Sequence, residues 1–334
     1  MRARSFLILS AVTLVVTAAA VAAVVEQDRP HSAIETSGPM LPGLADQLGE
    51  VAAIVLRDAD RTLTIKRGDS GWGIAELNDY PVPTDKVREI ARALVQLEKV
   101  EAKTMRADRY ARIGVEDVAK GATSKEVDLQ NAAGEPLARL IVGTFAAAAG
   151  AEGATFVRIP GDERAWLARG TVHVNLDPRD WVDRHLIAVP ATDIREVRIV
   201  RADRKTLTVV REGGDTGAFH FAEMPAGAKL KRPDAVQSIV ETFGDISLED
   251  LKPKAELTLP ADKTIHITVT RVDGTHLAFA MADIDGARWI IFEDGKEPAT
   301  LPAAGHGMAF QIPTWKVTPL ERQPQDLYEP ASGS

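Results

Sequence analysis

Alternating hydrophobic and polar positions dominate the first half of the chain and predict antiparallel β-strands. The alternation covers residues 53–57, 62–67 and 72–76, and the charged segment 58–61 forms the turn between the first two. A period of two directs one side of a strand towards a core and the other towards solvent. These strands are therefore expected to follow one another in one sheet.

A helix is expected after these strands. Pro81 and Pro83 end the alternation, and Thr84 is expected to cap the helix that follows. The hydrophobic residues then recur at helical spacing, at Val87, Ile90, Leu94 and Leu97.

The second half of the chain repeats this pattern, because residues 194–212 resemble residues 51–67. The matching positions are Trp72, Ile74 and Glu76 with Phe219, Phe221 and Glu223, then Asp85, Val87, Ile90, Leu94, Leu97 and Lys103 with Asp234, Val236, Ile239, Phe243, Ile246 and Lys252. A repeated pattern of this length indicates a duplicated module.

Both halves continue with further strands. A strand–turn–strand segment is expected at 126–143 and again at 263–281, and each half then adds a hairpin, at 155–169 and 285–294. The predicted fold class is therefore α+β, with two duplicated, mainly antiparallel modules that each have one principal helix.

The expected organisation has six parts. They are an apolar N-terminal segment, 1–25; a tether, 26–40; a first α+β module, 41–175; a connection, 176–190; a second α+β module, 191–318; and a C-terminal tail, 319–334. Trp181, Leu186 and Ile187 are expected to pack between the modules. The proline-containing C-terminal run is expected to form an edge strand and then an extended tail.

The N-terminal segment predicts a membrane anchor. Arg2 and Arg4 precede the uncharged apolar residues 5–25, a run long enough to cross a bilayer core as a helix. The arginines favour a cytoplasmic N-terminus. A cleaved signal peptide is the alternative, because small residues at 18–20 offer cleavage sites. Either interpretation places the residues after Glu26 in the periplasm or outside the cell, and the anchor makes the protein single-pass in the cytoplasmic membrane.

Charge and cysteine content exclude several classes of function. The formal net charge is -8 and the chain has no basic stripe of the kind that a nucleic-acid partner requires. The absence of cysteine excludes disulfides, thiolate metal sites and a cysteine nucleophile.

Two acidic triplets raise the question of a protease. The letters DSG at 69–71 and DTG at 215–217 are those of an aspartic-protease motif. A catalytic pair needs two carboxylates that share a proton, and each aspartate of such a pair lies on a loop that follows an apolar strand. In this chain, charged residues and glycine precede both triplets instead. Ser70 as a nucleophile would need a histidine base, and the only upstream histidine is His31 in the tether. We therefore expect a turn at both places.

No cluster of side chains predicts a metal or cofactor site. His266 and His276 are expected on neighbouring strands, where they could meet, but the histidines lack metal-binding spacing. Asp283 and Asp285 resemble the start of a calcium loop without its later ligands. The small-residue loop 146–154 lacks the lysine of a phosphate-binding loop. No catalytic, cofactor-binding or metal-binding residue is assigned.

The tryptophans leave one alternative open. Trp72, Trp166, Trp289 and Trp315 are expected on alternating strands with one side buried. An exposed tryptophan would instead provide a stacking platform for a sugar or a peptide.

Several segments, taken in order, resemble the DUF4340 family of bacterial envelope proteins, a domain of unknown function. They are residues 40–56, the hairpin with Gly71-Trp72, the helix region 80–104, and the segments 109–117, 138–143, 155–170 and 180–190. The resemblance covers essentially everything after the tether, and the alanine-rich loop 146–154 departs from it. It implies no catalytic residues, and it implies an accessory role beside ABC-type transport systems, including those similar to gliding-motility transporters.

The sequence therefore predicts a membrane-anchored, extracytoplasmic, non-enzymatic accessory protein with an ABC-type permease or ATPase complex as its partner. A module that binds envelope glycan or peptide is the alternative, and an aspartic-type hydrolase is a remote one. No cofactor and no nucleic-acid partner are expected.

Overall fold

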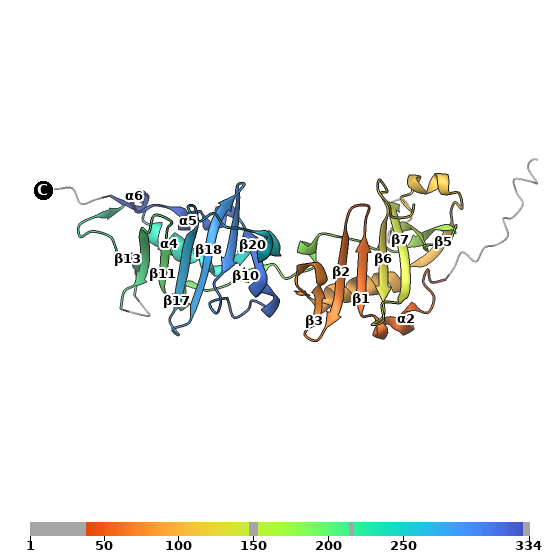
Figure 1. The fold of residues 1–334 in the computed structure, drawn as a ribbon, viewed down its shortest axis with the longest axis horizontal. Helices are drawn as coiled ribbons and strands as arrows, with labels where there is room; N and C mark the ends of the chain where they lie inside the picture. The colour runs from red at the N-terminus through yellow and green to blue at the C-terminus, as the bar shows by residue number, and fades with distance from the viewer. Residues whose placement is uncertain (1–37, 147–152, 214–216, 330–334) are drawn as a thin grey trace, which may run out of the picture.

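The chain forms two β-sheet lobes that follow one another in sequence and in space (Figure 1). The structure is a computed structural model, and it describes residues 38–146, 153–213 and 217–329. Both large sheets are antiparallel and few helices accompany them, which confirms a mainly antiparallel α+β architecture.

The predicted membrane segment, 1–25, and nearly all of the tether lie outside the described residues. Among the residues that are described, no helix is long and apolar enough to cross a bilayer.

The first sheet has nine strands within the described residues, in the order β4-β3-β2-β1-β6-β7-β8-β9-β5. They are β1 (Ala53–Arg57), β2 (Thr62–Gly68), β3 (Gly71–Ile74), β4 (Tyr80–Val82), β5 (Glu98–Ala102), β6 (Lys125–Gln130), β7 (Pro136–Ala146), β8 (Ala154–Arg158) and β9 (Ala165–Arg169). The strands expected at the start of the chain and at 126–143 and 155–169 are present.

The helix α3 (Thr84–Val95) packs on the core face of this sheet, as its hydrophobic spacing predicts. Val87, Ile90 and Leu94 are buried, and they lie on one side of the helix. The predicted cap is wrong, because Thr84 is already helical and Pro83 occupies the cap position without a side-chain hydrogen bond. Pro83 has a ψ of 129° and is not helical, so the helix starts at Thr84 itself and the threonine cannot occupy the cap position.

The second sheet has eight strands within the described residues, in the order β13-β12-β11-β17-β18-β19-β20-β16. They are β11 (Ile194–Val200), β12 (Thr206–Arg211), β13 (Phe219–Phe221), β16 (Asp250–Pro253), β17 (Ile265–Arg271), β18 (His276–Ile284), β19 (Ala287–Phe292) and β20 (Met308–Ile312). Its principal helix, α4 (Ala235–Glu241), is shorter than expected and continues as the 3₁₀ helix η6 (Thr242–Gly244).

The two sheets have the same strand order. The series β3-β2-β1-β6-β7-β8-β9-β5 corresponds position by position to the whole second sheet, from β13 to β16. The register of the edge hairpins agrees as well, because Ile65 lies opposite Ile74 and Val209 lies opposite Phe221.

One side-chain contact is also common to both edge hairpins. The Glu76 carboxylate accepts a hydrogen bond from the Thr64 backbone N–H at 3.0 Å, and Glu223 accepts one from Thr208 N–H at 2.8 Å. The N–H groups of Thr64 in β2 and Thr208 in β12 lie beyond the ends of the short neighbouring strands β3 and β13. Each glutamate thus supplies the acceptor that the neighbouring strand does not.

The remaining elements connect or flank these sheets. They are α2 (Leu44–Gln47), η1 (Leu48–Glu50), η2 (Ala75–Leu77), η3 (Ala107–Arg112), η4 (Pro178–Asp180), β10 (His185–Ile187), η5 (Ala191–Asp193), β14 (Lys229–Leu230), β15 (Ile246–Ser247), η7 (Lys254–Glu256), η8 (Ala303–Gly307), α5 (Thr314–Glu321), α6 (Pro324–Leu327) and β21 (Tyr328–Glu329).

The C-terminal segment differs from the prediction. β20 pairs with both β19 and β16, so it is an interior strand rather than an edge strand. The chain then forms α5 in spite of Pro319, and this helix crosses the expected boundary at 318. Leu320 and Leu327 are buried, and β21 pairs with β14. Burial of these leucines on the second lobe outweighs the hydrogen bond that proline removes.

The connection carries the three side chains that were expected between the modules. Trp181 is buried, and together with Ile90 and Ala93 of α3 it lines a hollow of the first lobe. Leu186 and Ile187 are buried in β10, which pairs with β15 of the second lobe. All three side chains belong to one continuous hydrophobic core that contains residues of both lobes.

Candidate functional site

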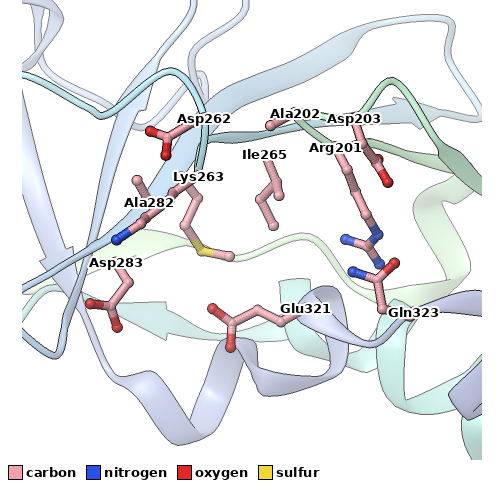
Figure 2. Close-up of a pocket in the computed structure, with 11 residues that line it drawn as sticks. Arg201, Ala202, Asp203, Asp262, Lys263, Ile265, Ala282, Asp283, Glu321 and Gln323 are labelled. Carbon is pink, nitrogen blue, oxygen red and sulfur yellow. The ribbon is translucent and has the colours of Figure 1, made fainter.

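A hollow of about 290 Å³ opens at one end of the second sheet (Figure 2). It lies where the ends of β11 and β18 and the turn before β17 meet the C-terminal end of α5. The side chains that line it are those of Arg201, Ala202, Asp203, Asp262, Lys263, Ile265, Met281, Ala282, Asp283, Glu321 and Gln323. Most of them are charged or polar, so the hollow suits a small polar group rather than an apolar one.

Arg201 is the buried cation of this hollow, with 6% of its surface exposed. Its Nη1 donates to the Leu320 carbonyl oxygen at 3.4 Å, and its Nη2 donates to the Arg322 carbonyl oxygen. Its Nε–H has no hydrogen-bond partner among the described residues. Burial lowers the pKa of the Arg201 guanidinium. The side chain therefore joins the last turn of α5 to β11 and keeps one donor unused.

Three carboxylates of the hollow pair with neighbouring cations. Glu321 Oε1 accepts from Arg288 Nε at 2.5 Å, and Asp283 also pairs with Arg288. Asp203 pairs with Lys205 at 2.9 Å, and this hydrogen bond lowers the pKa of the Asp203 carboxyl group. Asp203 is thereby stabilised as an ionised acceptor, which suits binding better than proton transfer.

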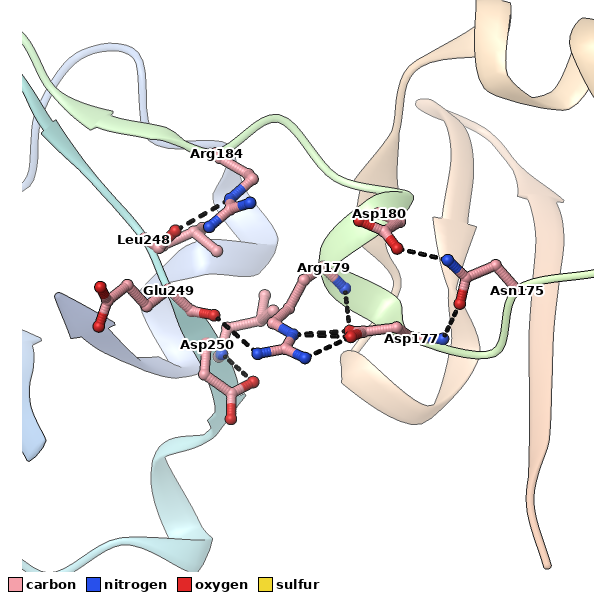
Figure 3. A network of polar contacts seen from close by, with 9 residues as sticks. Asn175, Asp177, Arg179, Asp180, Arg184, Leu248, Glu249 and Asp250 are labelled. Atoms are coloured by element: carbon pink, nitrogen blue, oxygen red, sulfur yellow. Dashed lines mark hydrogen bonds and ion pairs between the residues drawn. The ribbon is translucent and has the colours of Figure 1, made fainter. Parts of the chain in front are cut away.

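A second polar cluster lies in the connection between the lobes (Figure 3). Asp177 caps η4 by accepting from Arg179 N–H at 3.0 Å, and the Arg179 side chain returns to the same carboxylate at 2.8 Å. These contacts with Arg179 lower the pKa of the Asp177 carboxyl group. Arg179 Nη1 also reaches the Glu249 carbonyl oxygen at 3.5 Å, and Arg184 Nε donates to Leu248 at 3.2 Å. The cluster fixes the connection against the second lobe.

An aromatic contact joins the lobes directly. Tyr80 of β4 is 4% exposed, and its ring centroid lies 6.1 Å from that of Phe310 in β20. The neighbouring Asn78 Nδ2 lies 3.7 Å from the sulfur of Met308. Burial, with a smaller contribution from the charge of Asp183, raises the pKa of the Tyr80 hydroxyl to about 12.

This shift predicts a loss of stability at high pH. A tyrosine in the unfolded chain ionises near pH 10, so the folded state alone keeps its proton between about pH 10 and 12. Stability from this group is complete below pH 10 and is lost as the pH rises to about 12, by about 3 kcal/mol in total. Urea unfolding at pH 8 and pH 11.5 measures the difference in the free energy of unfolding between the two pH values. This difference should be smaller for Tyr80→Phe than for the wild-type chain, and it should be unchanged for Tyr328→Phe. Identical pH dependence in the wild-type chain and the Tyr80→Phe variant would contradict the assignment.

The structure places the first acidic triplet at a hairpin tip, as expected. Asp69 and Ser70 are exposed between β2 and β3, and Gly68 lies opposite Gly71, whose φ of 122° suits glycine. Asp215 lies outside the described residues, and its flanking strands β12 and β13 pair in the same way.

His266 and His276 lie on neighbouring strands, as expected, but the structure separates them along the hairpin. His266 lies opposite Ala280, whereas His276 lies opposite Thr270, four positions further along the hairpin. His266 Nδ1 lies 3.5 Å from Glu293, and His276 Nδ1 lies 3.2 Å from the Thr270 hydroxyl. Among the described residues, no group of three His, Asp or Glu side chains could hold a metal ion.

The acidic turn at 283–286 is a hairpin, as expected. Asp285 and Gly286 have positive φ angles of 52° and 85°, and Asp283 accepts from Gly286 N–H at 3.0 Å. Only the ends of the 146–154 loop are described.

The tryptophans divide into buried and exposed ones. Trp166 and Trp289 are buried and Trp72 is half-buried, on strands as expected. Trp315 is instead on α5 and is 75% exposed, so the prediction of a strand there is wrong. The helix forms because Val317 and Leu320 bury its other side.

Sequence reasoning missed Arg201, although the chain carries a signal for it. Val197 and Ile199 are buried on β11, and Arg201 continues the same alternation into the core. The pair Arg288–Glu321 has no such signal, because α5 brings Glu321 to the sheet only in the folded chain.

Comparisons with known proteins give a family and nothing beyond it. The family model described as "Domain of unknown function (DUF4340)" matches residues 72–264, which is more than half of the chain. The match is narrower than the segments of the expected resemblance, because it begins inside β3 and ends before β17. No curated protein and no solved structure matches the chain.

Proposed function

Because the chain belongs to the DUF4340 family, a domain of unknown function, we propose its function from its own sequence and geometry. It is a single-pass, membrane-anchored, extracytoplasmic accessory protein without enzymatic activity, and it binds an ABC-type transport complex. Its lobes are two copies of one module, 41–175 and 191–318, joined by 176–190.

The main observation behind this proposal is that the two sheets have corresponding strand orders and are joined by a single segment of chain. The common contact of Glu76 and Glu223 with a strand N–H supports a duplication. The uncharged residues 5–25 after two arginines support the anchor. A pair of lobes held at a membrane offers its surfaces to a membrane partner at high effective concentration.

Affinity purification tests the partner. The tagged full-length chain, extracted in mild detergent, should enrich a permease or an ATPase subunit over an unrelated single-pass protein with the same tag. The Asp69→Ala variant should recover the same partner, because Asp69 lies at an exposed hairpin tip. Repeated recovery of the protein without a transporter subunit would contradict the proposal.

Cysteine labelling tests the location separately. The chain contains no cysteine, so Ser70→Cys creates one exposed thiol. A membrane-impermeant maleimide should label this thiol in cells whose outer envelope is opened but whose cytoplasmic membrane is intact. Labelling that requires lysis of the cytoplasmic membrane would contradict the proposed orientation.

The exposure of Trp315 favours a second candidate, a module that binds envelope glycan or peptide. Its ring is 75% exposed, and Lys316 Nζ lies 5.7 Å from the ring centroid. Cell-wall fragments should then quench the fluorescence of the wild-type chain but not that of Trp315→Phe. Equal quenching of both proteins would contradict this candidate.

A further inference from the structure

A groove of about 430 Å³ runs along α3 in the first lobe and shares no residue with the hollow of Figure 2. The helix contributes Thr84, Val87, Arg88, Ala91, Arg92 and Val95, which repeat every three or four residues and so form one stripe. The facing walls come from η1 and from the hairpin of β2 and β3. Its volume lies in the range of sites for small ligands.

The groove is largely apolar. Leu48, Trp72, Ala91 and Val95 line it and are only half-buried. Trp72 lies on the same side of its strand as the fully buried Ile74, so it extends the core face of the sheet beyond the cover of α3. An aliphatic group in the groove would remove this surface from water.

The polar lining of the groove consists of cations and one hydroxyl group. Arg67, Arg88 and Arg92 are exposed, and no carboxylate or carboxamide side chain lines the groove with them. Arg88 pairs with Asp85 at 3.4 Å. The side chains of Arg67 and Arg92 make no ion pair and no hydrogen bond with any described residue. Guanidinium donors without acceptors suit a phosphate or carboxylate group.

The second lobe has an arginine at the corresponding hairpin position, but that arginine is already engaged. Arg211 lies opposite Phe219, as Arg67 lies opposite Trp72. Arg211 Nε donates to the Ile194 carbonyl oxygen at 3.0 Å, and its guanidinium carbon lies 4.5 Å from the Phe219 ring centroid.

The helices α3 and α4 also differ in the charged residues at corresponding positions. Val87 corresponds to Val236, so Arg88 and Arg92 correspond to Gln237 and Glu241. These two side chains hydrogen-bond to each other at 3.0 Å. The second lobe thus carries no arginine at either helix position, so the two helix arginines of the groove have no counterpart there.

The groove lies close to the start of the described chain. Its wall η1 begins at Leu48, and the chain between residue 25 and residue 38 spans at most about 45 Å when fully extended. An anchor at 5–25 therefore keeps the first lobe within this distance of the bilayer. This argument rests on the proposed function.

We propose that the first lobe binds an anionic lipid of the membrane in this groove. The aliphatic chain lies along α3 against Trp72 and Val95, and Arg67 and Arg92 hold the anionic head group. An acidic peptide would fit the charge as well, but its backbone N–H groups would meet no acceptor among the side chains except the Thr84 hydroxyl. The groove therefore favours a phosphate group, whose oxygens only accept hydrogen bonds.

Photolabelling of the full-length chain in bilayer nanodiscs tests this proposal. The nanodiscs contain phosphatidylcholine with a small fraction of phosphatidylglycerol, and one of the two lipids carries a diazirine in its acyl chain. Peptides containing Trp72 or residues 84–95 should be labelled by the phosphatidylglycerol probe. The phosphatidylcholine probe should label them about tenfold less, because it lacks a net negative charge.

Two double variants provide the controls. Arg67→Ala with Arg92→Ala should reduce labelling of the groove by about tenfold. Arg109→Ala with Arg112→Ala removes two exposed arginines of η3 in the same lobe and should leave labelling unchanged. Circular dichroism should show both variants folded, because all four side chains are exposed.

Three outcomes would overturn the proposal: no label in the groove, equal labelling by both probes, or protection of the groove only by an acidic amphipathic peptide. Failure of the transporter proposal would appear differently, as loss of the purified partner with labelling of the groove retained.

Discussion

Phe310→Ala is expected to lower the free energy of unfolding of the second lobe by about 3–5 kcal/mol. Phe310 is fully buried in the interior strand β20, and its ring centroid lies 5.9 Å from that of Phe292 and 6.1 Å from that of Tyr80. The truncation leaves a cavity between the sheet and the neighbouring lobe. Urea unfolding followed by circular dichroism measures the effect.

Phe145→Ala is the matched control for this change. The Phe145 side chain is 54% exposed, so its removal should change stability by no more than about 0.5 kcal/mol. Similar effects of the two substitutions would show that Phe310 is not the buried contact described here.

The same contact predicts coupling between the lobes. A double-mutant cycle with Tyr80→Leu and Phe310→Leu should give a coupling energy of about 0.5–1.5 kcal/mol, as for other aromatic pairs. The pair continues a series of aromatic contacts that includes Phe279 and Phe243 of the second lobe. Additive effects would mean that each lobe is stabilised independently of this contact.

Gly143→Ala is expected to destabilise the first lobe by about 3 kcal/mol, near the upper end of overpacking effects. A Cβ atom at Gly143 would lie 2.2 Å from the Ile113 carbonyl oxygen and 2.8 Å from that of Gly114. The backbone cannot retreat freely, because Thr144 N–H donates to the same Ile113 oxygen at 3.0 Å. Thermal unfolding and faster hydrogen exchange of residues 107–115 should report the change.

Gly244→Ala is the control for Gly143→Ala. No atom lies within 4 Å of a Cβ placed at Gly244, and this residue belongs to the 3₁₀ helix η6. The added methyl group should be neutral or should stabilise by up to about 1 kcal/mol. Equal destabilisation by both substitutions would contradict the close approach of β7 and the 113–115 segment.

The two concave surfaces on the lobes differ in their suitability for a ligand. In the hollow of Figure 2 the carboxylates of Asp203 and Glu321 already have cationic partners within the fold. In the groove along α3 the Arg67 and Arg92 side chains have no such partner among the described residues. For this reason the anionic lipid is proposed for the groove of the first lobe and not for the hollow of the second lobe.

Most strands could be predicted because their pattern is local. The alternation at 53–57 and 62–67 gives β1 and β2, and the repeat at 194–212 gives β11 and β12. The spacing of Val87, Ile90 and Leu94 gives α3, whose core face is the predicted one. Local periodicity was sufficient here because burial on one side dictates the residue type at each position.

The candidate sites could be predicted only in part. The sequence places Arg67 two positions before the 69–70 turn and Trp72 two positions after it. It does not show that η1 and α3 leave these two side chains partly exposed in a groove. Likewise, the prolines of the C-terminal segment predict an extended chain, but α5 forms there because two of its side chains are buried on the second lobe. Tertiary packing outweighed local preference at both places.

The sequence alone determined most strands of the two sheets, where the hairpin turns at 69–70 and 285–286 lie, and that both halves use one pattern. These features depend on neighbours a few positions away. Only the tertiary structure decided that β20 is an interior strand, that Tyr80 meets Phe310 across the lobes, and that Arg211 is bound where Arg67 is not. Such contacts join residues far apart in the chain, and their energies depend on burial and partner geometry that no local pattern records.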